Sequence, residues 1–365
     1  MTWSLDNIQE LGSSGVSAHL EIYGDENEET YQLYYSSLER GGLAIDSMSN
    51  DLQLTEQGVI PGPHDLTIIT TNQGIRRAYY INKDEIYTAL ISEDGLTLSE
   101  KTSTGISNNQ NKQAWGVPDA VVLPDGRVRI YWVDDDPDTN TQADEFIISA
   151  TSTTSAGTTF IVDDGRRVEG GYVDFEVLKA EENDWIAIMS SSPETIPDQP
   201  QGIYIGVSQD GLSWEINMNN LAPPEKSYLD PTGLLFPNSD KKWRIVMSES
   251  PSILGDREYS LVVAELTFIP PITTSSANDN IQSTTNDDYI DGLDGIDTVV
   301  YSGKFVNYSF SRSTNSIQIT DLRTTDGIDT LTNIENIQFA DQTVEESKVD
   351  IVKTYSGEFS DYKFY

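Results

Sequence analysis

An aspartate that opens a short apolar stretch recurs at nearly constant spacing through residues 1–269. The spacings are 59, 54, 55 and 56 residues, and the aspartates are Asp6, Asp65, Asp119, Asp174 and Asp230. The stretch after Asp119 is the clearest, because residues 124–126 (Pro-Asp-Gly) form turns readily and apolar residues alternate with others over 128–133. This pattern predicts two β-strands joined by a tight turn. Such a unit, repeated at this period, is typical of a solenoid or a propeller.

Glycines provide a second landmark in four of these units. They follow the aspartates of their own units by 36, 30, 38 and 37 residues: Gly42, Gly95, Gly157 and Gly211. We expect each glycine to turn the chain between a third and a fourth strand, which makes one propeller blade. The fifth unit has three clear strands and ends at Phe268. The predicted fold class is therefore all-β, with a five-bladed β-propeller over residues 1–269.

The start of the first blade allows two readings. If His19 opens it, only 23 residues remain before Gly42, too few for three strands and their turns, so we prefer Asp6. Too little chain precedes Asp6 to supply a full outer strand for the fifth blade. We therefore expect the ring to close without a blade shared between the two ends of the propeller.

The formal net charge is −38, of which residues 278–365 contribute −10 (16 acidic and 6 basic) and the rest of the chain −28. Acidity this general argues against nucleic acid as a partner, because phosphates would be repelled. It suits cation binding or solubility in salty water, and a solvated acidic surface is the plainer alternative. The absence of cysteine excludes disulfides and thiol catalysis, and no apolar run could span a bilayer.

Residues 270–282 read as a linker by composition, and residues 283–365 as a small β-rich domain. Residues 283–291 and 292–300 are two nonapeptides in tandem. The second fits the pattern Gly-Gly-x-Gly-x-Asp-x-apolar-x except at Leu293, and the first keeps Asp288 and Ile290. Glycine turns let carbonyl oxygens face a cation, and the aspartate adds a hard carboxylate oxygen. The candidate calcium ligands are Asp288, Asp294 and Asp297.

These nonapeptides, with residues 326–344 behind them, resemble the RTX or haemolysin-type calcium-binding segments of type-I-secreted bacterial proteins. The resemblance implies calcium as cofactor and export through a C-terminal signal, which fits an N-terminus without the basic and apolar regions of a leader. In RTX rolls a calcium site takes its ligands from repeats two units apart, so two tandem units supply only half a site. A turn that binds no ion therefore stays an alternative. Residues 301–310 recur as 355–364, and we expect this chain to be a fragment of a longer protein.

Five blades would bring the starts of five inner strands to one mouth of the central channel. Glu176 shares a strand face with Asp174, so the candidate catalytic residues are the five aspartates and Glu176. Like charges this close drive pKa values apart, as acid–base catalysis at a glycosidic bond requires. Candidate substrate-binding residues precede these acids: His64, Trp115, Tyr172 and Tyr228. The alternative is that the acids cap backbone N–H groups between blades, because structure repeats in every blade where catalysis does not.

The propeller resembles the five-bladed glycosidases of the arabinanase, levansucrase and invertase type. That resemblance implies an aspartate in each of the first two blades, matched by Asp6 and Asp65, and a glutamate acid in the third. Asp119 stands in the third place, and Glu176 is a substitute acid one blade later. Residues 208–214 resemble a shortened Asp-box, a structural turn. An EF-hand-like spacing joins four further acids, Asp134, Asp136, Asp138 and Glu145, with a solvated acidic loop as the alternative.

The sequence thus predicts an exported, calcium-associated propeller that acts on or binds carbohydrate, as a glycoside hydrolase if it is an enzyme. The alternative is a non-catalytic surface or adhesion module fused to a calcium-binding segment. The third-blade aspartate favours the alternative, and the acidic, aromatic-rimmed mouth favours the first reading.

Overall fold

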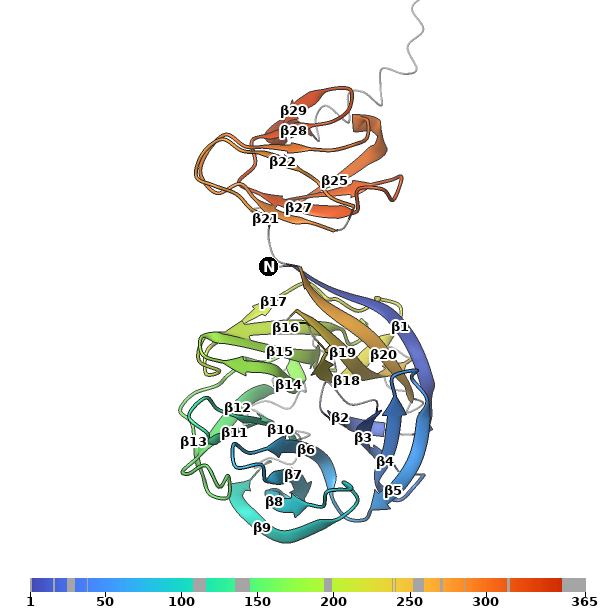
Figure 1. Ribbon diagram of the computed structural model, residues 1–365, viewed down its shortest axis with the longest axis vertical. Coiled ribbons are helices and arrows are strands. Elements are labelled where there is room, and N and C mark those ends of the chain that lie inside the picture. The colour runs from blue at the N-terminus through green and yellow to red at the C-terminus, as the bar shows by residue number, and fades with distance from the viewer. Residues whose placement is uncertain are drawn as a thin grey trace, which may run out of the picture. The chain divides into compact units, whose positions relative to one another are not determined.

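The computed structural model describes residues 2–349 except 16, 25–29, 38, 108–115, 135–144, 194–198, 238, 240, 252–258, 270–271, 286 and 314–315. The chain divides into two compact units, one of residues 4–267 and one that contains residues 268–349. Both are built from strands, which confirms the all-β class (Figure 1). No helix in the described part of the chain is long and apolar enough to cross a membrane.

The first unit contains five four-stranded sheets (Figure 1). The first two are β2 (Ser17–Tyr23), β3 (Thr30–Ser37), β4 (Gly42–Ser49), β5 (Leu54–Ile60), then β6 (His64–Thr70), β7 (Arg76–Asn82), β8 (Glu85–Ile91), β9 (Leu98–Ser107). The next two are β10 (Gly116–Val122), β11 (Val128–Asp134), β12 (Phe146–Ser152), β13 (Phe160–Val162), then β14 (Tyr172–Glu181), β15 (Asp184–Ser191), β16 (Ile203–Ser208), β17 (Trp214–Asn217). The fifth is β18 (Ser227–Leu235), β19 (Lys242–Ser250), β20 (Tyr259–Ile269) and β1 (Thr2–Gly15).

The innermost strands of these sheets lie side by side in the order β2, β6, β10, β14, β18, and β18 contacts β2 again. Apolar side chains fill the space between neighbouring sheets. Leu20 and Leu33 of the first sheet, for example, pack with Val246 and Leu261 of the fifth. The second strands of three sheets, β7, β11 and β15, are buried along continuous runs because each sheet is covered on both faces by its neighbours. The unit is a five-bladed β-propeller, as predicted.

The prediction for the start of the propeller is wrong. β1 is the outermost strand of the fifth sheet, beside β20, so one blade is shared between the two ends of the propeller. Asp6 therefore lies exposed on an outer strand, and its neighbour Asn7 donates a hydrogen bond to Glu265 at 2.7 Å. The first blade begins at β2. The 23 residues from His19 to Gly42 suffice because Gly42 opens the third strand and does not end it.

Three of the four landmark glycines do occupy the predicted turn. In each, the carbonyl accepts a hydrogen bond from a tyrosine of the preceding blade, at 3.1, 2.8 and 2.8 Å: Tyr34–Gly95, Tyr79–Gly157 and Tyr131–Gly211. A Cβ atom added to the glycine would lie 2.3, 2.3 and 2.7 Å from the tyrosine oxygen, respectively. The glycines are therefore needed for close approach between blades as well as for their positive φ.

In the second unit, the first four strands alternate between two sheets. One contains β21 (Ile272–Thr273), β23 (Tyr289–Asp291), β27 (Ile328–Thr332), β26 (Ile317–Asp321) and β25 (Tyr308–Arg312). The other contains β22 (Asn280–Gln282), β24 (Thr298–Val300), β28 (Asn336–Gln338) and β29 (Thr343–Glu345). The described helices here are two short 3-10 turns, η2 (Phe305–Asn307) and η3 (Glu346–Lys348). Pairing is parallel along β21–β23–β27 and β22–β24–β28, so the first coils form a roll.

The linker predicted at 270–282 is wrong in part, because β21 and β22 are strands of this roll. The sequence does contain a signal for these strands, a nine-residue spacing that the prediction overlooked. Asp279 and Ile281 stand nine residues before Asp288 and Ile290, so they occupy the same places in a third nonapeptide. Polar, small residues around them resemble a linker, but parallel pairing with β24 decides the structure.

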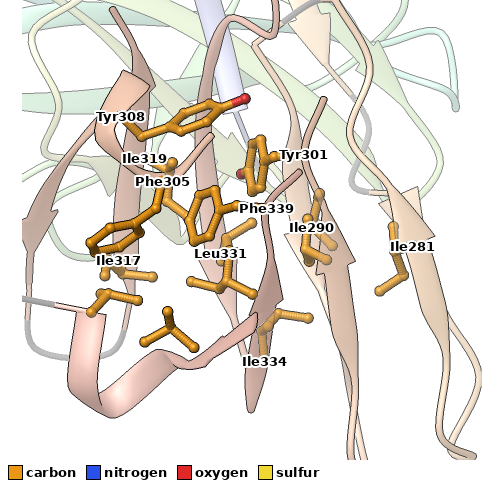
Figure 2. Close-up of a cluster of buried hydrophobic side chains, with 14 residues drawn as sticks. Ile281, Ile290, Tyr301, Phe305, Tyr308, Ile317, Ile319, Leu331, Ile334 and Phe339 are labelled. Carbon is orange, nitrogen blue, oxygen red and sulfur yellow. The ribbon is translucent and has the colours of Figure 1, made fainter. Parts of the chain in front are cut away.

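The roll is held together by an aromatic core (Figure 2). Residues 301–310, the segment that recurs at 355–364, supply Tyr301, Phe305, Tyr308 and Phe310. Their rings lie within 5.2–6.1 Å of the Phe339 ring, centroid to centroid. Residues 355–364 lie outside the described residues.

Candidate functional site at the mouth of the propeller

Each inner strand begins with a β-bulge at one equivalent residue. The φ angles there are 50°, 49°, 34°, 51° and 51°, for His19, Asp65, Val117, Asp174 and Asp230. Positive φ is tolerated by Asp and His far better than by a β-branched residue such as Val117. We call these five residues the upper ring. Bulges of this kind re-aim side chains and are common beside active sites.

The upper ring is linked from blade to blade. Asp174 Oδ2 accepts hydrogen bonds from the Asp230 backbone N–H at 3.2 Å and from the Ser190 hydroxyl. Asp230 accepts from the backbone N–H of His19, and the His19 imidazole donates to the backbone carbonyl of Leu66. Burial raises the pKa of Asp174, and burial followed by repulsion from Asp174 raises that of Asp230 well above its usual range. A carboxyl with a raised pKa can hold a proton near neutral pH.

Two residues further along each strand lies a second set, the lower ring. Each of its side chains accepts a hydrogen bond from a backbone N–H of the next blade, at distances of 2.8, 3.3, 3.0, 3.3 and 3.1 Å: Glu21–Ile68, Thr67–Ala120, Asp119–Val177, Glu176–Gly233 and Thr232–Ile22. The last pair joins the fifth blade to the first. Hydrogen bonds to the lower ring therefore link all five blades around the axis.

Three lower-ring side chains are buried carboxyls. Burial, then repulsion from Glu176 and Asp119, raises the pKa of Glu21 well above its usual range. Burial and repulsion from Asp119 do the same to Glu176. Burial raises the pKa of Asp119 to about 7, against the effect of its hydrogen bonds to Val177 and Ala120. The three groups therefore retain protons in the folded protein at a pH where free carboxyls would be ionised.

The structure separates the six predicted catalytic acids. Asp65, Asp174 and Asp230 meet in the upper ring, while Asp119 and Glu176 lie in the lower ring and carry the backbone contacts of the capping alternative. Asp6 is at neither level. Val117, not Asp119, holds the upper place of the third blade. Its bulge lies between Gly116 and Asp119, as that of the fourth blade lies between Val173 and Glu176, so Asp119 is the equivalent of Glu176. His19 was missed as a site residue. It could have been found from the match of His19-Leu-Glu to Asp65-Leu-Thr.

The predicted substrate-binding residues differ in surroundings. His64 is half exposed, its Nδ1 lies 3.3 Å from Asp65 Oδ2, and this hydrogen bond raises the pKa of His64. Tyr172 is partly buried and packs edge-on against Tyr204, at 5.3 Å between ring centroids. Tyr228 is buried and hydrogen-bonded to Glu249. Trp115 lies outside the described residues.

The other two sequence motifs lie away from the rings. Residues 208–214 form the expected structural turn, in which Asp210 Oδ1 accepts from the backbone N–H groups of Leu212 and Ser213. In the EF-hand-like stretch, Asp134 ends β11 and Glu145 is buried just before β12. Asp136 and Asp138 lie outside the described residues.

The predicted calcium ligands also differ in their hydrogen bonding. Both Asp288 oxygens accept hydrogen bonds from Thr284, at 2.7 and 2.9 Å, and Asp294 is exposed. Asp297 is fully buried, and its Oδ2 has no hydrogen-bond partner. A Cβ added to Gly292 would lie 2.7 Å from that oxygen and 2.0 Å from the Asn333 carbonyl. These two hard oxygens fit calcium, but no three acidic or histidine side chains of the described residues gather into a metal-binding group.

No known protein family matches the sequence, and no curated protein resembles it closely enough to be identified as a relative. Solved structures resemble the fold. An α-L-arabinofuranosidase from Podospora anserina, solved in complex with cellotriose, is 9% identical, covers 73% of this chain and 96% of its own, and has a TM-score of 0.56. The catalytic domain of a family-62 α-L-arabinofuranosidase from Coprinopsis cinerea is 10% identical, with the same coverage and a TM-score of 0.54.

A thermostable family-43 glycoside hydrolase is 14% identical, covers 69% of this chain and 90% of its own, and has a TM-score of 0.53. At these identities the likeness shows the fold alone. Residues 4–267 share their architecture with propellers described as glycoside hydrolases.

Proposed function

We propose that the propeller acts on carbohydrate and hydrolyses a glycosidic bond at its axial mouth. The observation that carries this proposal is the meeting of Asp65, Asp174 and Asp230 in one ring of bulged residues, each in a different environment. The fold shared with glycoside hydrolases supports it, as does the resemblance of the sequence to the arabinanase type.

The environments suggest separate roles for the three carboxyls. Asp230, protonated because it is buried beside Asp174, is the general acid that protonates the leaving oxygen. Asp65, hydrogen-bonded to His64, is the group that activates water or stabilises the developing positive charge on the sugar. Asp174 sets the proton affinity of Asp230 through its charge and through its bond to the Asp230 N–H.

The test begins with turnover of arabino-, xylo- and gluco-oligosaccharides by the full chain. We expect Asp65→Asn to reduce turnover by about 10²–10⁴-fold, the usual contribution of one acid–base group, without loss of folding. Asparagine keeps the shape of the side chain but cannot carry the charge. Asp184→Asn, an exposed change at the start of β15, is the matched control. Turnover that survives Asp65→Asn would contradict the assignment.

A non-catalytic carbohydrate-binding or adhesion module is the second candidate. One observation favours it: the upper places of the first and third blades are His19 and Val117, where the resemblance implies acids. In that case the wild type retains glycans on an affinity column and hydrolyses none of them.

We further propose that calcium binds the roll at Asp297 and the Asn333 carbonyl. Binding to the folded state alone should raise the free energy of unfolding by about 2.7 kcal/mol at a hundredfold excess over Kd. Thermal melts of the full chain with calcium and with chelator measure this. Asp297→Asn should abolish the shift and Asp294→Asn should preserve it. Superimposable wild-type melts would reject calcium binding. Export through a C-terminal signal stays a prediction.

A further inference from the structure

His19 and Val117 are the two upper-ring residues that no sequence motif identified as functional, and His19 is the polar one of the two. It is 6% exposed, and its Nε2 has no hydrogen-bond partner. Asp230 Oδ2, in the neighbouring blade of the same ring, is likewise buried without a partner. Most buried polar atoms in proteins are hydrogen-bonded, so two orphans in one ring point to a group that the protein itself does not supply.

The hydrogen bonds of the imidazole decide what Nε2 can do. The ring donates to the Leu66 carbonyl, and because Nε2 has no partner, the donor is Nδ1. Burial lowers the pKa of His19, more than the nearby Asp65 and Asp174 raise it, so the ring is neutral at pH 7. A neutral imidazole protonated on Nδ1 offers a lone pair on Nε2. His19 Nε2 is therefore a hydrogen-bond acceptor to which no group of the protein donates.

The surrounding groups narrow the class of ligand. His64 is the other titratable group near His19, besides Asp65, Asp174 and Asp230. Among the described residues no metal-binding group exists here. A carboxyl such as Asp230, protonated in its buried place, donates, whereas His19 Nε2 accepts. A sugar presents the two matching groups side by side: a hydroxyl that donates to Nε2 and a glycosidic oxygen that accepts from Asp230.

We infer that His19 is a ligand-binding residue whose Nε2 accepts a hydrogen bond from a hydroxyl of the bound sugar, with Asp230 Oδ2 as the neighbouring contact. This inference rests on the proposed carbohydrate function and deepens it. It also assigns the first blade a neutral, hydroxyl-reading residue in the place where the resemblance implies a charged one.

Nitrogen NMR can test this directly because the chain contains only two histidines. In protein labelled with ¹⁵N-histidine, His64→Gln identifies the His19 signals. We expect the Nδ1-protonated neutral tautomer at pH 7, and a shift of the Nε2 resonance on titration with glycerol or a turned-over oligosaccharide. Dimethyl sulfoxide, which accepts hydrogen bonds but cannot donate one to Nε2, should move it less. A ring protonated on Nε2, or an Nε2 signal unmoved by every hydroxyl probe, would overturn the inference.

A matched pair of variants supplies the second readout. Glutamine places its oxygen near the position of Nε2, whereas asparagine reaches only to Nδ1 and tolerates the positive φ of this site. We expect His19→Asn to weaken oligosaccharide binding about tenfold and His19→Gln to restore most of it, with tryptophan fluorescence reporting intact folding. Equal binding by both variants and the wild type would contradict the role of His19 while leaving hydrolysis at Asp65 standing. If the wild type neither hydrolyses nor binds any sugar but its His19 Nε2 resonance still responds to glycerol, the carbohydrate function is rejected and the hydroxyl-binding site at His19 is kept.

Discussion

The free energy of unfolding of the propeller is expected to fall by several kcal/mol between about pH 4 and pH 8. The cause is the lower ring, in which Glu21, Asp119 and Glu176 have raised pKa values in the folded protein. Between the ordinary carboxyl pKa of about 4 and the raised pKa of the folded protein, the native state binds more protons than the unfolded state, so stability decreases as pH rises. The stabilisation from these protonated carboxyls is fully present below a pH of about 4 and is lost above the pKa of the folded protein.

The magnitude follows from Asp119. A pKa raised from about 4 to about 7 corresponds to on the order of 4 kcal/mol. His19 opposes this trend, because a pKa lowered by burial favours the folded state as pH rises through its ordinary value near ~6.5. Denaturant unfolding at a series of pH values, followed by tryptophan fluorescence, measures the sum. Five of the six tryptophans lie within residues 4–267, so this signal reports mainly on the propeller.

Glu176→Gln is the sharpest variant for this effect. Glutamine can still accept from the Gly233 N–H, but it removes a charge that raises the pKa of Glu21. The variant should therefore flatten the pH dependence and stabilise the protein at pH 8. Glu215→Gln, an exposed change on β17, should alter neither. A stability curve that rises from pH 5 to pH 8 in the wild type would contradict this account.

Phe339→Ala is expected to cost the C-terminal unit about 3–5 kcal/mol. Phe339 is 3% exposed, and four aromatic rings surround it, with Tyr301 stacked at an interplanar angle of 18° (Figure 2). Truncation removes these contacts and leaves a cavity that a rigid aromatic core cannot close. Amide hydrogen exchange over residues 280–349 should accelerate by about 10²–10⁴-fold, since exchange from a cooperative unit tracks its free energy of opening.

Val306→Ala is the matched control, because Val306 lies on η2 beside the same core but is 66% exposed. Its exchange should match the wild type within about twofold, as for ordinary surface substitutions. Unchanged protection in Phe339→Ala would mean that the aromatic cluster does not hold the roll together.

Much of the propeller could be predicted because each blade repeats a local pattern. Asp65, Asp174 and Asp230 were placed correctly at the starts of inner strands, since the polar residue, the following apolar stretch and the turn are all encoded within about twenty residues. The register failed in the third blade. There, the bulged residue is Val117, two positions before Asp119. Left-handed backbone disfavours a β-branched residue, so the residue type at 117 does not mark the bulge as Asp does in other blades.

The first blade and the roll could not be assigned from local pattern for a different reason. Whether β1 opens one blade or completes another depends on β20, some 250 residues away, and no periodicity within β1 distinguishes the two. Residues 270–282 are likewise strands only because β23 and β24 lie beside them. The candidate site could not be completed from local pattern either, because His19 is recognised as an upper-ring residue only once β2 is known to be an inner strand.

The shared fifth blade also sets the order of events during synthesis. β1 leaves the ribosome before the other propeller strands, but its partner β20 begins at Tyr259, so β1 waits while residues 16–258 are made. At translation rates of about 5–20 residues per second, that wait lasts roughly 10–50 s. Throughout it, β1 carries unpaired backbone groups of the kind that recruit other strands. The first four blades can assemble as they emerge, whereas the ring itself can only be completed after nearly the whole propeller has been translated.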